Sequence, residues 1–463
     1  MKGKQSTIAW IIISLIVFVI ELLVVSDNPT TTRYFEFQLL LLWSIALFLS
    51  YKKFGILNLY TLFLLTTMIF SIGGVLHFFV SGESICVLED RGFGDYVFSH
   101  SVIQKTLIVY TIFIWISYLT YQEIYTPKVY ELRQRNEVNN LKLQKIGITL
   151  MYAFLAIEIY KGYLYVSTFS ISRVLIYLYG SMENPIPRWV RLLATFYEVG
   201  YFFIIASKPD KKIFKKFSLL YFVAIIPEII LGNRAMFGAF LLFYLWYYNK
   251  FYKAKAIKTK YLVIGGAVMI LVFQMMEFYR NGLSLSGSSY SLTSFLVGQS
   301  ISFYILPFYM VYSGSIQYYL YPFVLYTFLG GFSGYTGQSI EVLEHKCGVG
   351  HQLMYAINPD YYLAGASIGS SSITELYDLG LWGVIAGAIL LPYMIRFFDR
   401  KMQTSTFVRF VSFTVFSDIV LSPRGSFFPG AYGIVKLYLF YIAVMWAFSF
   451  IYKSKSNEIK FKE

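Results

Sequence analysis

The chain has 463 residues and a formal net charge of +14, with 57% hydrophobic, 20% aromatic and only 14% charged residues. Soluble domains carry about 25% charged residues, so this chain lacks the polar surface that a water-soluble protein of its size needs. Composition therefore excludes a soluble enzyme, a fibrous protein, a disordered chain and a disulfide scaffold. Apolar runs repeatedly reach the roughly 20 residues that cross a bilayer, which predicts an all-α polytopic membrane protein.

The apolar runs predict about twelve transmembrane helices, within a range of about 11 to 14. In chain order they are Thr7–Val25, Phe35–Tyr51, Phe54–Val80, Val102–Tyr121, Ile146–Thr168, Trp189–Ser207, Phe217–Leu231, Ala235–Asn249, Tyr261–Phe278, Ser372–Ile395, Thr404–Leu421 and Gly430–Tyr452. The first run is long and lacks a small-residue cleavage site, so we expect a spanning helix there and not a cleavable signal peptide.

The basic residues are distributed unequally between alternate loops of this topology. The set of connections that includes the N-terminus, Lys52 and Lys53 holds 26 of the 39 basic residues, and the opposite set holds 12. Cytoplasmic loops carry an excess of Lys and Arg. We therefore expect both termini on the cytoplasmic side.

The sequence divides into three parts on this topology. Residues 1–278 form nine spans with short loops, residues 279–371 form one large external loop, and residues 372–463 form three spans and a cytoplasmic tail. Within the loop, Phe295–Tyr312 and Gln317–Leu329 are apolar, and we expect short interfacial or re-entrant helices there. Two further spans are the alternative.

Arginine is concentrated on the external side. The inner set of basic residues contains 22 Lys and 4 Arg, whereas the outer set contains 4 Lys and 8 Arg. The outer arginines are Arg33, Arg91, Arg173, Arg188, Arg191, Arg234, Arg280 and Arg424. Arg presents a rigid, permanently charged fork that binds phosphate or carboxylate bidentately. This bias indicates an anionic ligand, although anchoring at lipid headgroups is the alternative for each arginine.

Four of these arginines are the candidate ligands for that anion. Arg234 lies between two short spans, so it should face a cavity or a partner and not lipid. Arg424 follows Pro423 at a second broken outward helix end. Arg280 ends the ninth span, where a salt bridge with Glu277 is the alternative, and Arg191 completes the set.

The segment before the tenth span carries the other candidate residues. Its Gly/Ser run opens a helix, where Ser371, Ser372 and free backbone N–H groups would meet an anion such as a lipid pyrophosphate. Glu375 is either the acid of a Ser372-x-x-Glu375 capping box or a catalytic carboxylate. His351 is either a general base or a structural histidine. We identify no metal site and no nucleotide-binding motif.

Several motifs resemble those of the bacterial O-antigen polysaccharide polymerases of the Wzy type. Gly232-Asn233-Arg234 is similar to the family's G-[ST]-R element, with Asn in place of the usual hydroxyl residue. Asn358-Pro359 followed by Gly369–Tyr377 resembles its N-P…G-S-S-x-I-x-E-x-Y stretch, and Ser422–Gly425 resembles its late R-G element. The order of these motifs along the chain, together with the number of spans and the late external loop, supports the resemblance.

The resemblance implies a GT-C-like glycosyltransferase of the bacterial inner membrane, acting at the periplasmic face in O-antigen and lipopolysaccharide biosynthesis. It would join undecaprenyl-pyrophosphate-linked oligosaccharide repeat units without metal, cofactor or nucleic acid. The arginines would stabilise the pyrophosphate leaving group, and Glu375 or His351 would activate the acceptor hydroxyl. A polysaccharide chain-length regulator is a candidate partner, besides membrane lipids.

Two other functions stay open at this point. An O-antigen ligase shares the architecture and an external histidine, a role that His351 would fill. A flippase or other transporter would carry ionisable residues at mid-bilayer. The candidates for that role are Glu158, Glu198, Glu228 and Asp418.

Overall fold

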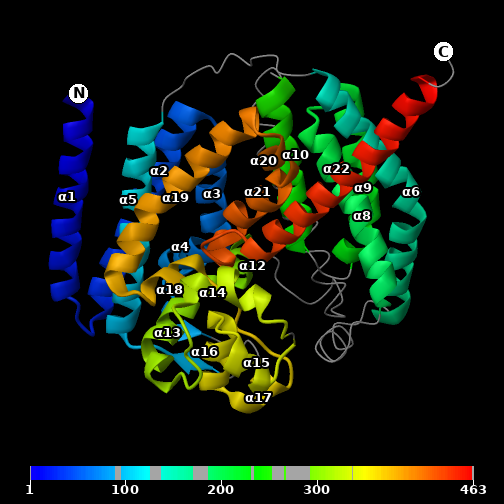
Figure 1. Ribbon diagram of the computed structural model, residues 1–463. Coiled ribbons are helices and arrows are strands. Elements are labelled where there is room, and N and C mark those ends of the chain that lie inside the picture. The colour runs from blue at the N-terminus through cyan, green and yellow to red at the C-terminus, as the bar shows by residue number, and fades with distance from the viewer. Residues whose placement is uncertain are drawn as a thin grey trace. The chain divides into compact units, whose positions relative to one another are not determined.

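The computed structural model describes residues 2–88, 95–125, 137–169, 186–230, 234–252, 265–266, 292–335 and 337–460. The described chain is helical apart from one two-stranded antiparallel ladder, which confirms the predicted all-α class (Figure 1). It forms two compact units. Unit 1 comprises residues 1–129, 254–397 and 417–429, and unit 2 comprises residues 130–253, 398–416 and 430–463.

Unit 1 combines long helices from the N-terminal part of the chain with many short ones. Its elements are α1 (Lys2–Leu23), α2 (Pro29–Phe54), α3 (Leu59–Thr67), the π-helix η1 (Met68–Ile72), α4 (Gly73–Ser81), β1 (Val87–Leu88), β2 (Tyr96–Val97), α5 (His100–Ile124), α12 (Leu292–Gln299), η2 (Ser300–Phe303), α13 (Ile305–Tyr312), η3 (Ser313–Ser315), η4 (Phe323–Leu325), α14 (Tyr326–Leu329), η5 (Gly330–Phe332), α15 (Ile340–His345), α16 (Val349–Ile357), α17 (Pro359–Leu363), α18 (Ser372–Tyr377), most of α19 (Gly380–Thr404) and η6 (Ser422–Arg424).

Unit 2 is built from long helices. They are α6 (Glu137–Phe169), α8 (Arg188–Ala206), α9 (Lys211–Ile230), α10 (Arg234–Tyr252), the short α20 (Thr406–Phe410) and α22 (Ala431–Lys460). The helix α21 (Ser412–Leu421) begins in unit 2 and ends in unit 1. The core of unit 2 is aromatic, and Tyr201, for example, stacks on Tyr221 with ring centroids 4.3 Å apart.

Capping residues explain where the first long helices begin and end. The side chain of Asn28 accepts a hydrogen bond from the Thr30 amide, and Pro29 occupies the first turn of α2. Such residues stabilise a helix start because they satisfy or remove amides that lack intrahelical partners. α2 ends at Gly55, whose φ of +85° favours glycine. Ser99 caps α5 in the same way as Asn28 caps α2.

Eight helical segments of the described chain are long and apolar enough to cross a membrane. They are Pro29–Phe54, Leu59–Ser81, His100–Ile124, Leu141–Thr168, Arg188–Ala206, Phe295–Ser315, Gly380–Thr404 and Ala431–Ser449. The protein is therefore a multi-pass membrane protein. The first eight predicted spans each coincide with helical structure, whereas most of the ninth, Tyr261–Phe278, lies outside the described residues.

Two predicted spans are interrupted, and for them the prediction of single continuous helices was wrong. The tenth, Ser372–Ile395, is split into α18 and α19 by a turn that ends at Gly380, where φ is +69°. The eleventh, Thr404–Leu421, is split into α20 and α21 around Val411. A hydropathy run reports apolar composition, and composition does not distinguish one long helix from two short ones.

The long loop after the ninth span is largely helical. Phe295–Ser315 is long and apolar enough to cross a membrane, so for the first of the two apolar stretches a span stays an alternative to an interfacial helix. The second stretch contains only the short η4 and α14. Figure 1 shows α13 to α18 gathered at one end of unit 1, away from the N-terminal end of α1. The boundary at 278/279 falls outside the described residues, and the three-part division stays a prediction.

Arg409 binds the C-terminal ends of two helices in unit 2. Its side chain is buried and donates hydrogen bonds to the carbonyls of Ala206, Met402 and Gln403, at 2.9, 3.2 and 3.3 Å, and to the Thr406 hydroxyl. These carbonyls lack intrahelical donors because α8 ends at Ala206 and α19 ends two residues after Met402.

We expect Arg409→Met to lower the free energy of unfolding by roughly 3 kcal/mol, because it leaves buried carbonyls without donors. Thermal unfolding of the purified protein in detergent measures the effect. The exposed Arg188 on α8 provides the control, and Arg188→Met should be nearly neutral. Equal melting temperatures for the two variants would contradict this assignment.

Candidate functional site

The carboxylate of Glu375 is buried at the first turn of α18 and accepts hydrogen bonds from Phe427, Ser370 and Ser426. The Ser370 hydroxyl donates to Oε1 at 3.0 Å, and the backbone N–H of Phe427 donates to Oε2 at 2.9 Å. Only 1% of the residue is exposed. No cation is among these partners, so neutral donors alone stabilise the charged form of the carboxylate.

The helix that carries Glu375 differs from its predicted form. Ser371 is the N-cap of α18, and its side chain makes no capping hydrogen bond. The capping-box alternative for Ser372 and Glu375 is therefore wrong, since the carboxylate bonds Phe427, which lies 52 residues further along the chain. α18 has only six residues, so it offers no long helix dipole to an anion.

Two glycines of α19 hold α18 close. A Cβ at Gly383 would lie 2.1 Å from the carbonyl oxygen of Leu376, and one at Gly387 would lie 2.4 Å from the Leu376 side chain. Glycines four residues apart let helices approach closely. A larger residue at Gly383 would displace the backbone carbonyl of Leu376, next to Glu375 in α18, whereas one at Gly387 would displace only the end of the Leu376 side chain.

Asp378 anchors the turn between α18 and α19. Its carboxylate accepts hydrogen bonds from the hydroxyls of Tyr309 and Tyr319, at 2.7 and 2.9 Å, and from the backbone N–H of Phe323, at 2.8 Å. Three segments of the long loop are thus fixed to this turn. Sequence analysis missed Asp378, because nothing local in the sequence distinguishes it from a surface acid.

Arg424 lies at the end of η6, above the π-helix η1. Its Nη1 donates a hydrogen bond to Gln299 Oε1 at 3.2 Å, and its guanidinium lies 5.9 Å from the centre of the Phe70 ring. The arginine is exposed. Gln299 and Phe70 thus orient the Arg424 guanidinium, which remains accessible. Phe70 belongs to the π-helix η1, and π-helices are often found at functional sites.

The backbone joins this arginine to the buried carboxylate. Phe427, whose N–H binds Glu375, is three residues from Arg424. Three residues of extended chain span at most about 11 Å. The two sequence motifs that contain Glu375 and Arg424 therefore meet in unit 1, and a single substrate is large enough to contact both residues.

Burial raises the pKa of Glu375 to about 7. The hydrogen bonds from Phe427, Ser426 and Ser370 oppose this shift in pKa, and the nearby carboxylate of Asp378 adds to it. Glu375 precedes the apolar helix that begins at Gly380. A carboxylate with a pKa near neutrality is suited to accept and release a proton at physiological pH.

The family model for O-antigen polysaccharide polymerase Wzy matches residues 6–455, nearly the whole chain. The chain belongs to this family. Wzy polymerases join lipid-linked oligosaccharide repeat units, and the protein is accordingly a glycosyltransferase whose substrate is a lipid-linked oligosaccharide. No curated protein and no solved structure matches the chain. The family match supports the polymerase over the ligase and the flippase among the functions predicted from sequence.

His351, the other candidate base of this Wzy polymerase, lies on α16 and not in a loop. Its Nδ1 is 3.4 Å from the Tyr362 hydroxyl. Burial lowers the pKa of His351 to about 4, and the Lys346 ammonium acts in the same direction. The imidazole is therefore neutral at pH 7, and its described partner is Tyr362 and not Glu375.

Two parts of the stretch Asn358–Tyr377, which resembles the Wzy pattern, have positions in the structure that do not require a ligand. Asn358 caps α17 by accepting a hydrogen bond from the Tyr361 amide at 3.0 Å, and Pro359 follows at the first position of that helix. Ser371 and Ser372 are no more than 1% exposed, so an anion does not reach their hydroxyls in this conformation. The hydroxyl of Ser370, which sequence analysis did not select, contacts Glu375 instead.

The other predicted arginines are not gathered with Arg424 by any described contact. Arg191 is exposed on α8 of unit 2, and Arg234 is the first residue of α10 in the same unit. The side chain of Arg234 and the whole of Arg280 lie outside the described part of the chain. Arg33 is structural, because it binds the carboxylate of Glu36 and the carbonyls of Phe78 and Glu83.

Proposed function

We propose that Glu375 is the general base and that Arg424 stabilises the leaving group in polymerisation of lipid-linked repeat units. The observation that carries the proposal is the hydrogen bond from the Phe427 amide to Glu375, because it holds the arginine-bearing turn beside a buried carboxylate. A base and a cation on neighbouring segments suit a reaction in which a proton leaves one substrate while negative charge develops on another.

The proposed step is a single displacement at the anomeric carbon of the growing glycan. A hydroxyl at the non-reducing end of the acceptor repeat unit gives its proton to Glu375 and forms the new glycosidic C–O bond. The bond between the anomeric carbon and the polyprenyl pyrophosphate breaks, and Arg424 stabilises the charge of the released pyrophosphate. Because the leaving group is already activated, the proposal assigns no role to a metal or a cofactor.

The remaining predicted residues have secondary roles in this proposal. Arg191, Arg234 and Arg280 are further pyrophosphate ligands on the strength of their external positions in the predicted topology. Ser371 and Ser372 lie at the start of α18, the helix that carries Glu375, and stay proposed substrate ligands at its first turn. Since Glu375 is buried, the proposed step requires a local opening that brings the acceptor hydroxyl to its carboxylate.

The proposal places the reaction at the periplasmic face of the bacterial inner membrane, with both termini in the cytoplasm and a GT-C-like arrangement of about twelve spans. Undecaprenyl pyrophosphate is the proposed carrier, and a chain-length regulator is a candidate partner. In unit 1, Thr7 near the start of α1 bonds Glu123, and Lys53 at the end of α2 bonds Gln122. These helix ends therefore lie together, which supports placing them on one side of the membrane.

A transporter mechanism gains no support from Glu158, the first of the ionisable residues considered for it. Glu158 forms an ion pair with Lys161 one turn along α6, at 2.9 Å. Such a local pair explains why an acid is tolerated inside an apolar helix.

The pH dependence of the reaction distinguishes the two candidate bases. If Glu375 is the base, kcat/KM for purified enzyme with lipid-linked repeat units rises with pH up to about 7 and then levels off, because only the deprotonated carboxylate accepts a proton. The rate at pH 6 should be about a tenth of that at pH 8. The assay contains EDTA, in which the enzyme must remain active.

A flat profile between pH 5 and pH 8 would contradict Glu375 as the base and favour His351, whose pKa of about 4 leaves it deprotonated throughout that range. Thermal unfolding at each pH controls for loss of the folded protein. Loss of activity in EDTA would overturn the metal-independent mechanism.

A further inference from the structure

A pocket of about 500 Å³ lies among three helices at one end of unit 1. α1, α2 and α5 line it with Thr7, Trp10, Leu49, Lys52, Lys53, Trp115, Tyr118, Leu119 and Gln122. In Figure 1 this end of unit 1 contains the start of α1 and lies opposite the short helices α13 to α18. The pocket is therefore separate from the site that contains Glu375.

Polar and apolar side chains are sorted by depth in this pocket. On α1, Thr7 lies one turn nearer the helix end than Trp10. On α2, Lys52 and Lys53 lie one turn nearer the end than Leu49. α5 follows the same order, with Gln122 outside Tyr118 and Leu119. All three helices thus present a polar mouth above an apolar floor, as an amphipathic ligand requires.

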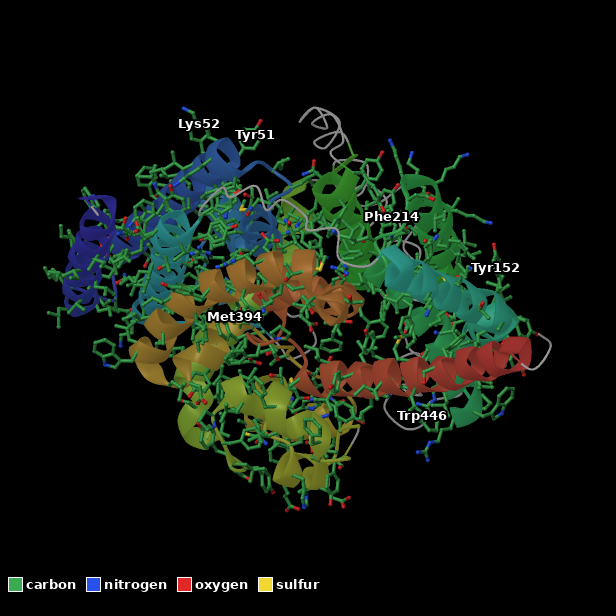
Figure 2. All side chains as sticks on the ribbon, turned by 45° about the horizontal axis from the view of Figure 1, so that its top comes forward. Tyr51, Lys52, Tyr152, Phe214, Met394 and Trp446 are labelled. Carbon is green, nitrogen blue, oxygen red and sulfur yellow. The ribbon has the colours of Figure 1, made fainter. Side chains whose placement is uncertain are left out.

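The mouth of the pocket is positively charged. Figure 2 shows Lys52 at the end of α2, with its side chain directed away from the ribbon. The ammonium of Lys53 donates a hydrogen bond to the Gln122 carbonyl at 3.3 Å. The nearest carboxylate on α5, that of Glu123, accepts a hydrogen bond from the Thr7 hydroxyl at 2.8 Å. Two lysines and one acid leave an excess of positive charge, which suits a monoanionic ligand.

Part of the apolar floor of the pocket belongs to α1, a helix with many exposed apolar side chains. Many apolar side chains of α1 are at least half exposed, including those of Ile8, Trp10 and Ile13. A hydrogen bond from Trp115 Nε1 to Ser14 Oγ, at 3.1 Å, joins α5 to α1 below the pocket. A ligand that fills the space above this bond would add apolar contacts that α1 otherwise lacks.

We propose that this pocket binds one anionic phospholipid, with its phosphodiester between Lys52 and Lys53 and an acyl chain against Trp10, Trp115 and Leu119. Basic pockets between membrane helices bind lipid headgroups in this manner. A free phosphate would satisfy the lysines but leave the apolar floor empty, and a zwitterionic lipid would fill the floor without a net charge for the lysines. The bound lipid stabilises the packing of α1 against α2 and α5.

Native mass spectrometry of the full-length protein in detergent tests the proposal with three probes. They are phosphatidylglycerol, phosphatidylcholine and inorganic phosphate. We expect wild-type protein to retain one phosphatidylglycerol and neither of the other probes. Each lysine near a membrane surface contributes about 1 kcal/mol to anionic-lipid binding, so Lys52→Gln with Lys53→Gln should weaken retention about thirtyfold. The same lipid should raise the melting temperature of wild type and not that of the double variant.

Two matched variants separate this site from general attraction of lipid to lysine. Lys105→Gln with Lys212→Gln removes the same charge from exposed positions outside the pocket and should leave retention unchanged. Lys52→Arg with Lys53→Arg keeps the charge and should restore binding. Equal retention of phosphatidylcholine, binding of phosphate alone, or equal losses in the two glutamine variants would each overturn the proposal.

Discussion

Replacement of Glu375 by glutamine is expected to lower the rate of polymerisation by a factor of about 10²–10⁴, which is the usual contribution of a general base. The amide has the shape of the carboxylate and still accepts a hydrogen bond from the Phe427 amide, so the packing of α18 is preserved. It does not take a proton from the acceptor hydroxyl. In a deletion strain complemented with Glu375→Gln, a gel should show single repeat units in place of the glycan ladder.

Asp378 provides the matched control for this experiment. It is a second acid in the same segment, and its carboxylate binds Tyr309, Tyr319 and Phe323. Asp378→Asn should therefore lower the melting temperature while leaving a ladder, provided that membrane expression is maintained. A normal ladder from Glu375→Gln, or a loss of folded protein that explains its phenotype, would contradict the catalytic role.

Hydropathy alone predicted most of the helices, because apolar length is what a membrane requires of a segment. It did not predict the breaks. Gly383 leaves room for the Leu376 carbonyl at the turn between α18 and α19, because a Cβ there would lie 2.1 Å from that oxygen, and this glycine is a signal in the sequence for the close approach. The π-helix Met68–Ile72 has no comparable local signal, since it lies inside one apolar run.

The candidate site was predictable in its parts but not in its assembly. Glu375 and Arg424 were each selected from local sequence, yet the bond that links their segments joins residues 52 apart. Gln299, which holds the Arg424 guanidinium, is 125 residues away. Such long-range contacts are set by the packing of whole helices. Periodicity and motifs describe single segments, so they do not determine which side chains from distant segments meet.

Replacement of Arg424 by alanine is expected to reduce kcat by a factor of about 10²–10³, the range measured when one preorganised donor to a developing anion is removed. The arginine is accessible, and Gln299 and Phe70 orient it, so little reorganisation is needed as charge develops on the pyrophosphate. Arg424→Lys keeps the charge but loses the planar fork, and we expect it to restore only part of the rate.

The changes in kcat and KM of Arg424→Ala distinguish stabilisation of the leaving group from binding of the substrate. If it stabilises the leaving group in the transition state, kcat falls and KM changes little, whereas a role in holding the substrate would raise KM at nearly unchanged kcat. Arg188→Ala, at an exposed arginine of α8 to which no role is assigned, should leave both constants unchanged. Glu375→Gln and Arg424→Ala act on one step, so their combined effect should be smaller than the product of the two single effects. A full ladder and an unchanged kcat in Arg424→Ala would contradict this role and would favour Arg191 and Arg234 of unit 2 as the residues that bind the pyrophosphate.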